Sequence, residues 1–248
     1  MNRYYKKQNA FTLVEMAMVL LIIGVLTKSA ISPLSVMREH RLHQQAEQQV
    51  QTVREAVFAY LVAYGSLPCP LSESANFLVS SNAGNLEDLS GTRCDVASGF
   101  VPTHLLALAG ATNEQGALLD PWGRSLRYAV SLSNSTEAGD QALPDWTTPG
   151  EAAHVGISNL SSSLVICNSA ATANCTGRAI RASQIAFVVL STGADSSAQG
   201  YQSENLDGDD YFVSSGLSIA QDTYYDDLLV WGSNADVIFW LLRMGWLP

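Results

Sequence analysis

The chain has 248 residues, of which 47% are hydrophobic and 15% are charged. This length suits one globular domain with an additional segment, and the apolar fraction excludes a disordered or fibrous protein. A formal net charge of −10 argues against nucleic acid as a partner, because affinity for phosphates depends on clustered Lys and Arg. A local basic patch remains compatible with this charge, but we expect no nucleic-acid partner.

The N-terminus combines a basic leader with an apolar segment. Residues 1–10 carry three basic side chains and no acid, and residues 11–26 are apolar except for one Thr and Glu15. The apolar run of about 16 residues is shorter than the roughly 20 that span a bilayer, unless flanking turns contribute. Lys28 can snorkel, and the basic leader predicts a cytoplasmic N-terminus. We therefore predict one membrane helix, with the rest of the chain outside the cytoplasm.

An ordinary secretory signal peptide is the main alternative. Its cleavage site follows the apolar region, with small residues one and three positions before the cut. The best candidate here is Lys28-Ser29-Ala30, and Lys28 is unsuitable at the outer position. An acid inside an apolar run costs about 2.5–3.5 kcal/mol on insertion scales, so it normally has a partner and a role. Glu15 therefore favours a specialised signal over a signal peptide, or over a signal anchor with an incidental Glu.

The residues around Glu15 are specific. The segment Gln8-Asn9-Ala10-Phe11-Thr12-Leu13-Val14-Glu15-Met16 resembles the prepilin signal of type IV pilin-like proteins and type II secretion pseudopilins. In that family a membrane peptidase cuts before the Phe and methylates the new amino group. The resemblance implies cleavage between Ala10 and Phe11 and an N-methylated Phe11, with Ala10 in place of the usual Gly. Gly24 and Pro33 fit the family's tendency to have a Gly and a Pro in the membrane helix.

Cleavage at this position has an electrostatic consequence. It leaves a cationic amine on Phe11 in the membrane, while Glu15 is a buried anion four residues away. The two groups of one helix are poorly placed to neutralise each other. A neighbouring subunit, staggered by about one turn, would bring its own terminus to Glu15 and offset several kcal/mol of desolvation. We therefore expect Glu15 to set the register of assembly.

The resemblance also implies partners and a location. The partners would be the prepilin peptidase, an inner-membrane assembly platform and the other pilins or pseudopilins of the filament. The chain would cross the inner membrane once, with its globular part in the periplasm, before joining a periplasmic pseudopilus or a cell-surface pilus. The family's extreme tip subunit often lacks the helix Glu, so Glu15 predicts a subunit that sits beneath another. The large globular part favours a minor subunit.

Beyond Pro33 the helical pattern continues towards Gly65, which offers a stop. Its apolar side chains recur at spacings of three and four: Leu42, Ala46, Val50, Val53, Val57, Tyr60, Leu61 and Tyr64. This stripe predicts the face that seats a globular domain, because a coiled coil would need a longer stripe flanked by paired charges. His40 and His43, one turn apart, suit either a metal site or, as we favour, a solvated face near the membrane.

The four cysteines form two sequence-local pairs, Cys69 with Cys94 and Cys167 with Cys175. Neither pair has the CxxC spacing of a zinc or redox site. Outside the cytoplasm we expect disulfides, whereas in the cytosol four free thiols would be expected. Three connectivities are possible, and we favour the local one because it needs the least rearrangement.

The globular part alternates between short strand-like runs and loops rich in Ser, Gly, Asn and Thr. We expect long loops at 72–99 and 131–163, a short helix around 104–109, and a final helix through Arg243 that is capped by Ser233 or Asn234, ended by Gly245 and docked on the sheet. The expected strands are Leu126–Val130, Leu164–Cys167, Ile185–Leu190, Tyr211–Ser214 and Leu228–Trp231.

These elements predict an α+β fold, with a long N-terminal helix packed on an antiparallel sheet. The expected segments are a leader at 1–10, a transmembrane and filament-core helix at 11–37, an amphipathic helix at 38–65 and a globular domain at 66–248.

Two further stretches carry the resemblance. Residues 120–128, Asp-Pro-Trp-Gly-Arg-Ser-Leu-Arg-Tyr, are similar to the Asp-Pro-Trp-Gly-x-Pro turn of type II secretion pseudopilins, which implies that Trp122 packs in the core at the helix–sheet junction. Residues 190–195 and 204–207 are similar to the calcium-binding loop of the major pseudopilin.

This second similarity implies Asp195 and Asp207 as ligands of a structural Ca²⁺, with Asp209 and Asp210 nearby. Carboxylates are suitable hard ligands for this ion. An acidic solvated loop is the alternative that we favour, and no EF-hand pattern is present, because Asp210 stands where the loop Gly should be. We expect no other cofactor.

Catalytic motifs are lacking. The sequence has no Gly-x-Ser-x-Gly elbow, no phosphate-binding Gly loop and no His-Glu-x-x-His helix, and His104 and His154 are isolated. The sequence therefore predicts a structural filament subunit and not an enzyme. The alternative is a surface adhesin or receptor on the same anchor, with the long loops as its binding face. The pseudopilin-like turn and loop favour a type II secretion pseudopilus over a type IV pilus or a competence filament.

Overall fold

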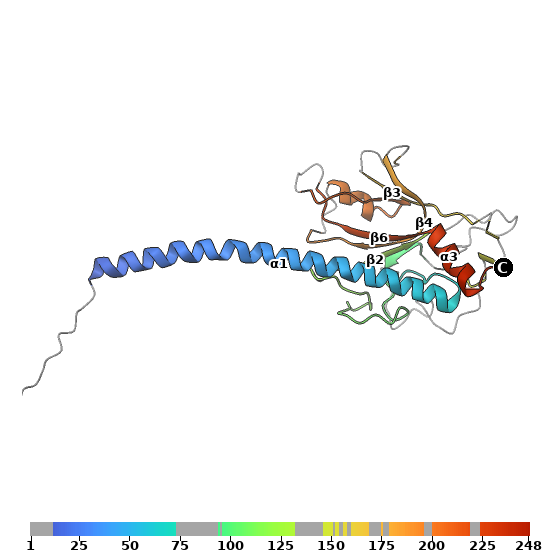
Figure 1. Cartoon of the computed structure of the whole chain (residues 1–248), viewed down its shortest axis with the longest axis horizontal. Coiled ribbons are helices and arrows are strands. Elements are labelled where there is room, and N and C mark those ends of the chain that lie inside the picture. Colours follow the sequence, from blue (N-terminus) through green and yellow to red (C-terminus); the bar gives the residue numbers. More distant parts are fainter. Residues whose placement is uncertain are drawn as a thin grey trace, which may run out of the picture. The chain divides into compact units, whose positions relative to one another are not determined.

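A computed structural model describes residues 12–72, 94, 96–131, 146–150, 152–153, 156–157, 160–168, 175, 179–195, 200–218 and 224–248, without the side chains of 27–36. The elements that lie fully within these residues are α-helices, strands and a 3₁₀ helix (Figure 1). In chain order these are α1 (Leu13–Tyr64), β1 (Ser98–Phe100), β2 (Arg127–Val130), β3 (Leu164–Cys167), β4 (Ile180–Ser191), η2 (Gly200–Leu206), β5 (Tyr211–Val213), β6 (Leu228–Ser233) and α3 (Asn234–Met244).

The chain divides into two compact units, Met1–Gln44 and Gln45–Pro248. Helix α1 contributes its first part to the N-terminal unit and its remainder to the globular unit. An α+β fold with a mainly antiparallel sheet is therefore confirmed. Among the described residues, no helix contains a stretch long and apolar enough to span a bilayer.

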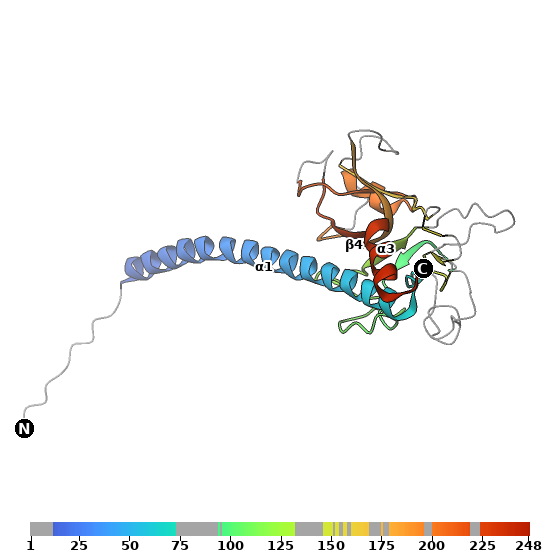
Figure 2. The ribbon, with the colours of Figure 1, turned by 45° about the vertical axis from the view of Figure 1, so that its right-hand side comes forward.

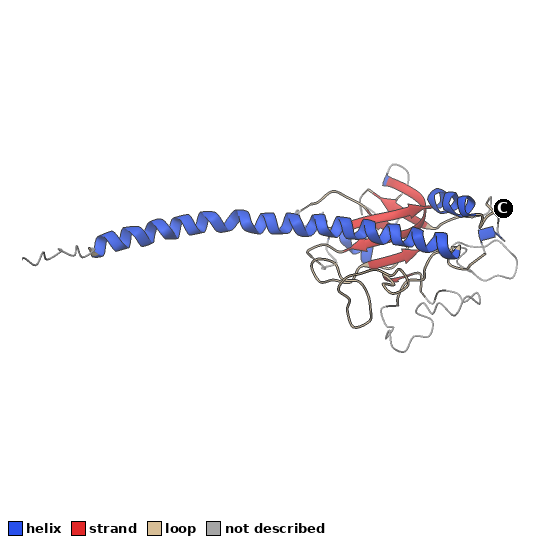
Figure 3. Cartoon of the chain, turned by 60° about the horizontal axis from the view of Figure 1, so that its bottom comes forward, coloured by secondary structure: helices blue, strands red, loops and turns tan. Residues whose placement is uncertain are grey.

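The C-terminal half of α1 lies across one face of the sheet (Figure 3). Ala46, Val50, Val53, Val57 and Leu61 are all at most 1% exposed, which confirms that the predicted stripe seats the globular unit. Buried side chains at this period place one face of the helix against the sheet and leave the opposite face to solvent.

Helix α1 ends where the sequence predicts. Gly65 has a φ of 72°, and a Cβ at this position would lie 2.7 Å from ring atoms of Trp246. The indole nitrogen of Trp246 donates to the carbonyl of Val62 at 3.1 Å. The C-terminal tail thus satisfies one of the carbonyls that the last turn of a helix leaves free. Because the Trp246 ring leaves no room for a side chain, the residue that ends α1 has to be a glycine.

Strand β4 is the centre of the sheet. Its C-terminal half pairs antiparallel with β2 on one edge and with β6 on the other, and its N-terminal half pairs with β3. Ile185 is opposite both Leu164 of β3 and Ser233 of β6, so β3 and β6 lie on opposite sides of β4. Strands β2 and β3 therefore lie one after the other along the same side of β4. The Ser131 hydroxyl accepts from the Ser163 amide at 2.7 Å and links the adjoining ends of β2 and β3.

Alternating side chains of the sheet enter two apolar clusters. Tyr128 and Phe187 pack with the stripe of α1, whereas Ala129 and Val188, one position along each strand, pack with Phe212 on the opposite face. Every residue from Ile185 to Ser191 is buried, as expected for a strand covered on both faces.

Helix α3 begins and ends as predicted. Ser233 is the N-cap, its side chain accepts from the Asp236 amide, and the Asp236 carboxylate accepts from the Ser233 amide, which makes a capping box. Gly245 closes the helix in the left-handed conformation with a φ of 77°. Val237 and Leu241 are buried in the core shared with α1, and Figure 2 shows α3 beside the C-terminal end of α1.

The five predicted strands are confirmed as β2 to β6, although β4 begins earlier than expected, at Ile180. Three expectations are wrong. Residues 103–107 form turns and no helix, because Ala107 takes a φ of 49° and interrupts the helical path. The sheet contains one parallel pair, β3 with β5. The loop expected at 72–99 ends earlier, because Ser98 and Gly99 belong to strand β1.

A fourth correction concerns Trp122, which is half-buried and lies outside the core clusters. The fully buried indole of the described residues is instead Trp146, which is 1% exposed and donates to the Ser162 hydroxyl at 2.9 Å. A buried indole needs such a partner, and the tight turn around Trp122 keeps that side chain at the surface.

Candidate functional site

The first turns of α1 form the candidate assembly site. Every residue from Thr12 to Leu26 is exposed, including Leu13 at 86% and Leu26 at 62%. A continuous apolar surface of this kind is unfavourable in water and requires cover by lipid or by other helices. Glu15 is the acidic residue of this segment and lies in the first turn.

Thr12 caps the helix from which Glu15 projects. The Thr12 hydroxyl accepts from the Glu15 amide at 3.3 Å, so Glu15 occupies the third helical position, where a negative charge is favoured by the helix dipole. The Thr-x-x-Glu pattern before an apolar run was visible in the sequence as a helix start. The predicted cleavage residues, Ala10 and Phe11, lie outside the described residues.

The two histidines next to the apolar segment take separate partners. His40 contacts the Gln44 side chain at 3.2 Å, and His43 lies 3.8 Å from the Glu39 carboxylate. Both are local i,i+4 pairs along the helix. These contacts agree with a solvated helix and give no sign of a shared metal.

Both disulfides of the predicted connectivity are present. Cys69 is bonded to Cys94 with a Cα–Cα distance of 5.4 Å, and Cys167 to Cys175 with 5.9 Å. Cys167 is also paired with Ile180 across the β3–β4 hairpin, so the second disulfide closes that connection. All four cysteines of the chain are used, and none is free.

The turn at residues 120–124 is organised by Asp120. This carboxylate is 6% exposed and accepts from the amides of Trp122 and Arg124, both at 2.9 Å, and from the Ser191 hydroxyl at 2.8 Å. It therefore closes the turn and ties it to the end of β4. The buried carboxylate is fully used in holding two backbone segments together, which is a structural role.

The same turn positions the loop that follows β4. The Arg124 guanidinium donates to the carbonyl of Gly193 at 2.7 Å, and the Asp226 carboxylate accepts from the amides of Ala194 and Asp195 at 2.8 and 3.0 Å. The Arg124 guanidinium thus binds carbonyl groups of this loop, and the Asp226 carboxylate binds its amide groups. Asp195 is fixed here through its backbone.

The candidate metal cluster comprises Glu204, Asp207 and Asp209, whose carboxylate oxygens lie within 4.8 Å of one another. Burial raises the pKa of Glu204, and repulsion from Asp207 and Asp209 adds to the shift. Burial also raises the pKa of Asp209, against the effect of the hydrogen bond that it accepts from the Tyr211 amide. Of the two residues predicted from the sequence, Asp207 belongs to this cluster and Asp195 does not. Three close carboxylates suit a hard cation such as Ca²⁺.

Asp227 was not anticipated from the sequence. It is 5% exposed, and its Oδ2 accepts from the Asn205 side chain at 2.7 Å. The Oδ1 atom is buried without a hydrogen-bond partner among the described residues. Burial is the main cause that raises the pKa of Asp227 to about 7; Asp226 adds to the shift, while Asn205 and Arg124 oppose it.

Asn205 makes this acid part of a structural link. Its side chain donates to the Val213 carbonyl and accepts from the Val213 amide, at 3.1 and 2.7 Å. Asn205 therefore joins η2 to β5, and its bond to Asp227 adds the start of β6. No sequence motif marks this contact, because the three segments meet only in the folded chain.

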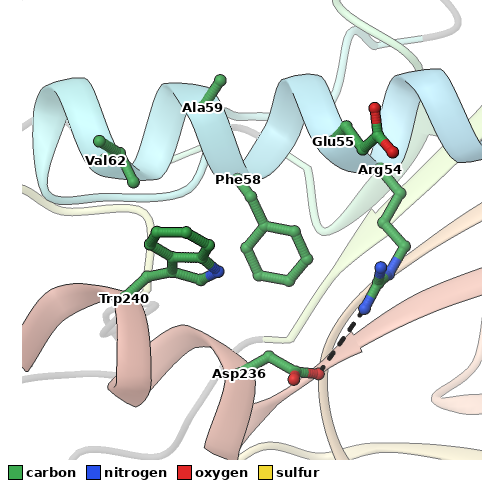
Figure 4. A pocket seen from close by; sticks show the side chains of 7 residues that line it. All are labelled: Arg54, Glu55, Phe58, Ala59, Val62, Asp236 and Trp240. Atoms are coloured by element: carbon green, nitrogen blue, oxygen red, sulfur yellow. Dashed lines mark ion pairs between the residues drawn. The ribbon is translucent and has the colours of Figure 1, made fainter. Parts of the chain in front are cut away.

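A groove of about 530 Å³ lies between α1 and α3 in the globular unit (Figure 4). Its walls include the rings of Phe58 and Trp240. At one end Arg54 lies 3.9 Å from the Asp236 carboxylate and donates to the Trp231 carbonyl at 2.6 Å. The lining contains no nucleophile–base pair, so the groove gives no support to catalysis.

The comparisons with known proteins concern the N-terminal segment. Residues 5–27 match the family model of the prokaryotic N-terminal methylation motif. This motif is the signature of prepilin substrates among type IV pilin-like proteins and pseudopilins, so the recognition of a prepilin signal is confirmed. No curated protein and no solved structure matches the chain.

The buried carboxyl of Asp227 predicts how stability depends on pH. Its folded pKa of about 7 lies above the ordinary value of 3.8, so the folded state binds more protons between these values. Stability should therefore fall as the pH rises from about 4 to 7, by up to roughly 4 kcal/mol. Asp227→Asn should remove most of this slope and stabilise the full chain at pH 8, as measured by denaturant unfolding in detergent.

The matched control is Asp210→Asn, because Asp210 is an exposed acid in the neighbouring loop. This variant should keep the pH dependence of the wild type. An Asp227→Asn variant with the same slope as the wild type would show that Asp227 is ionised in the folded protein at pH 5.

Proposed function

We propose that the chain is a structural minor subunit of a type IV pilin-like filament. The observation that carries the proposal is an acid, Glu15, inside an exposed apolar helix start that matches the N-terminal methylation motif. A prepilin peptidase removes residues 1–10 and methylates the amine of Phe11. The helix then anchors the subunit in the inner membrane, with the globular unit in the periplasm.

Assembly follows from the charge at Glu15. In the membrane a carboxylate in the first turn is uncompensated, and a neighbouring subunit supplies the cation through its processed N-terminus. The Thr12 hydroxyl accepts from the Glu15 amide and fixes the start of the helix from which the carboxylate projects. Lateral packing of the exposed apolar side chains buries the rest of the segment. The subunit has no catalytic role.

A type II secretion pseudopilus is the filament that we favour. The support is the turn closed by Asp120, since the corresponding sequence resembles that of pseudopilins and ties directly to β4. The alternative function, an adhesin or receptor, would use loops 72–99 and 131–163 as a binding face, and most of these residues lie outside the described part of the chain.

Replacement of the acid tests the assembly role. Glu15→Val should leave membrane insertion intact and reduce incorporation beside other subunits by about tenfold or more, because a lost charge pair worth about 1.4 kcal/mol already gives tenfold. Filament fractions and carbonate-washed membranes measure the two quantities. Glu39→Gln, on the same helix beyond the apolar run, should assemble normally. Normal incorporation of the Glu15→Val subunit would remove the charge-pair mechanism.

We also propose a structural Ca²⁺ site at Glu204, Asp207 and Asp209, supported by their close carboxylates and by the mutual repulsion that a cation would relieve. Ca²⁺ at 100 times its dissociation constant stabilises a protein by about 2.7 kcal/mol, so the Tm of the full chain should rise by roughly 5–10 °C. Asp207→Asn should abolish the rise. Asp195→Asn, outside the cluster, should keep it, and an equal Tm in Ca²⁺ and in chelator would refute the site.

A further inference from the structure

A cationic face lies on α1 immediately beyond its apolar segment. Arg38 and Arg41 are three residues apart, so their side chains project about 60° from each other around the helix. Both are exposed, and among the described residues neither guanidinium has an ion pair or hydrogen bond. We refer to these two residues as the arginine face.

The neighbouring acid does not neutralise this face. Glu39 lies about 100° from Arg38 around the helix and contacts His43. His40 lies about 160° from Arg38 around the helix and contacts Gln44. The two arginines therefore share one side of the helix, and the Glu39–His43 and His40–Gln44 pairs lie away from it.

The position of the arginine face relative to the bilayer follows from helix geometry. It depends on the membrane placement that the proposed function gives to the helix. At 1.5 Å per residue, a helix that enters the hydrocarbon at Phe11 leaves its 30 Å core near residue 31, and Arg38 is about 40 Å from Phe11. This is close to the outer edge of the lipid headgroups. Helical side chains lean towards the N-terminus, so the Arg38 guanidinium reaches back into the headgroup layer, and Arg41 lies within a Debye length of it.

The rest of the chain has the opposite charge. Residues 45–248 contain seven arginines, no lysine and twenty-one acids, which gives the globular unit a formal net charge of −14. An anionic membrane surface repels such a unit. In the sequence, Arg38 and Arg41 follow the apolar segment and Lys28 and precede this acidic unit.

From these observations we propose that the arginine face binds anionic phospholipid headgroups of the outer leaflet while the subunit waits in the membrane. The guanidinium pairs with phosphate through two parallel hydrogen bonds, which suits lipid phosphodiesters. The contact holds the helix at one depth and opposes the repulsion of the acidic unit. Assembly then has to release this contact as the helix leaves the lipid.

Lipid binding can be measured on the full, processed chain in nanodiscs of phosphatidylcholine with about 30% phosphatidylglycerol. Native mass spectrometry reports the phosphatidylglycerol that remains bound. Each basic residue near an anionic surface contributes about 1 kcal/mol, so Arg38→Gln should lower the retained phosphatidylglycerol about fivefold and the double variant with Arg41→Gln about 25-fold. Arg243→Gln, an exposed arginine on α3, is the matched control and should retain the lipid.

The intact mass in the same spectra separates this inference from the proposed function. A chain that inserts but keeps residues 1–10 contradicts the proposed function. Unchanged phosphatidylglycerol in the double variant of a correctly cleaved chain refutes the lipid contact alone. Unchanged lipid with lost filament incorporation also refutes it and assigns Arg38 and Arg41 to the acidic surface of a neighbouring subunit.

Discussion

One continuous helix has to satisfy two environments. Helix α1 runs without interruption from Leu13 to Tyr64, and its first part exposes apolar side chains on all sides while its second part buries one stripe in the globular core. A helix can do both because its backbone hydrogen bonds are internal and only its side chains meet the surroundings. Thr12 and Glu15 lie at the start of the apolar part, and the arginine face lies beyond its end.

The globular unit is arranged around the buried stripe. Phe187 of β4 meets Phe58 of α1 at a ring-centroid distance of 5.2 Å, and Gly232 of β6 leaves room for the same ring, since a Cβ there would overlap it. Arg54 extends this packing to β6 and α3 through Trp231 and Asp236. The helix, the sheet and the final helix therefore depend on one another.

Local signals were readable in the sequence. The stripe of α1, the glycine stops at Gly65 and Gly245, and the cap of α3 are encoded by residues close in the chain, so they were predicted at the right positions. Features that depend on distant contacts were missed or misplaced. Asp227 is buried only because η2, β5 and β6 converge on Asn205, and the parallel pairing of β3 with β5 has no local signature.

The candidate sites show the same division. A prepilin signal is a contiguous motif, and its recognition is confirmed by the match at residues 5–27. A metal site depends on which carboxylates the loops bring together, and the structure groups Asp207 with Glu204 and Asp209 while Asp195 is held through its backbone beside Asp226. Spacing alone cannot decide between these arrangements, because the intervening residues set the path of the loop.

The central claim is that processing creates a charged terminus four residues before Glu15. Intact mass of the protein extracted from its native membrane tests this most directly. The account predicts a chain that begins at Phe11 and carries one additional methyl group. A mass for the uncut chain, or for a chain cut near Ala30, would contradict it, because the cation that Glu15 requires from a neighbour would then be absent.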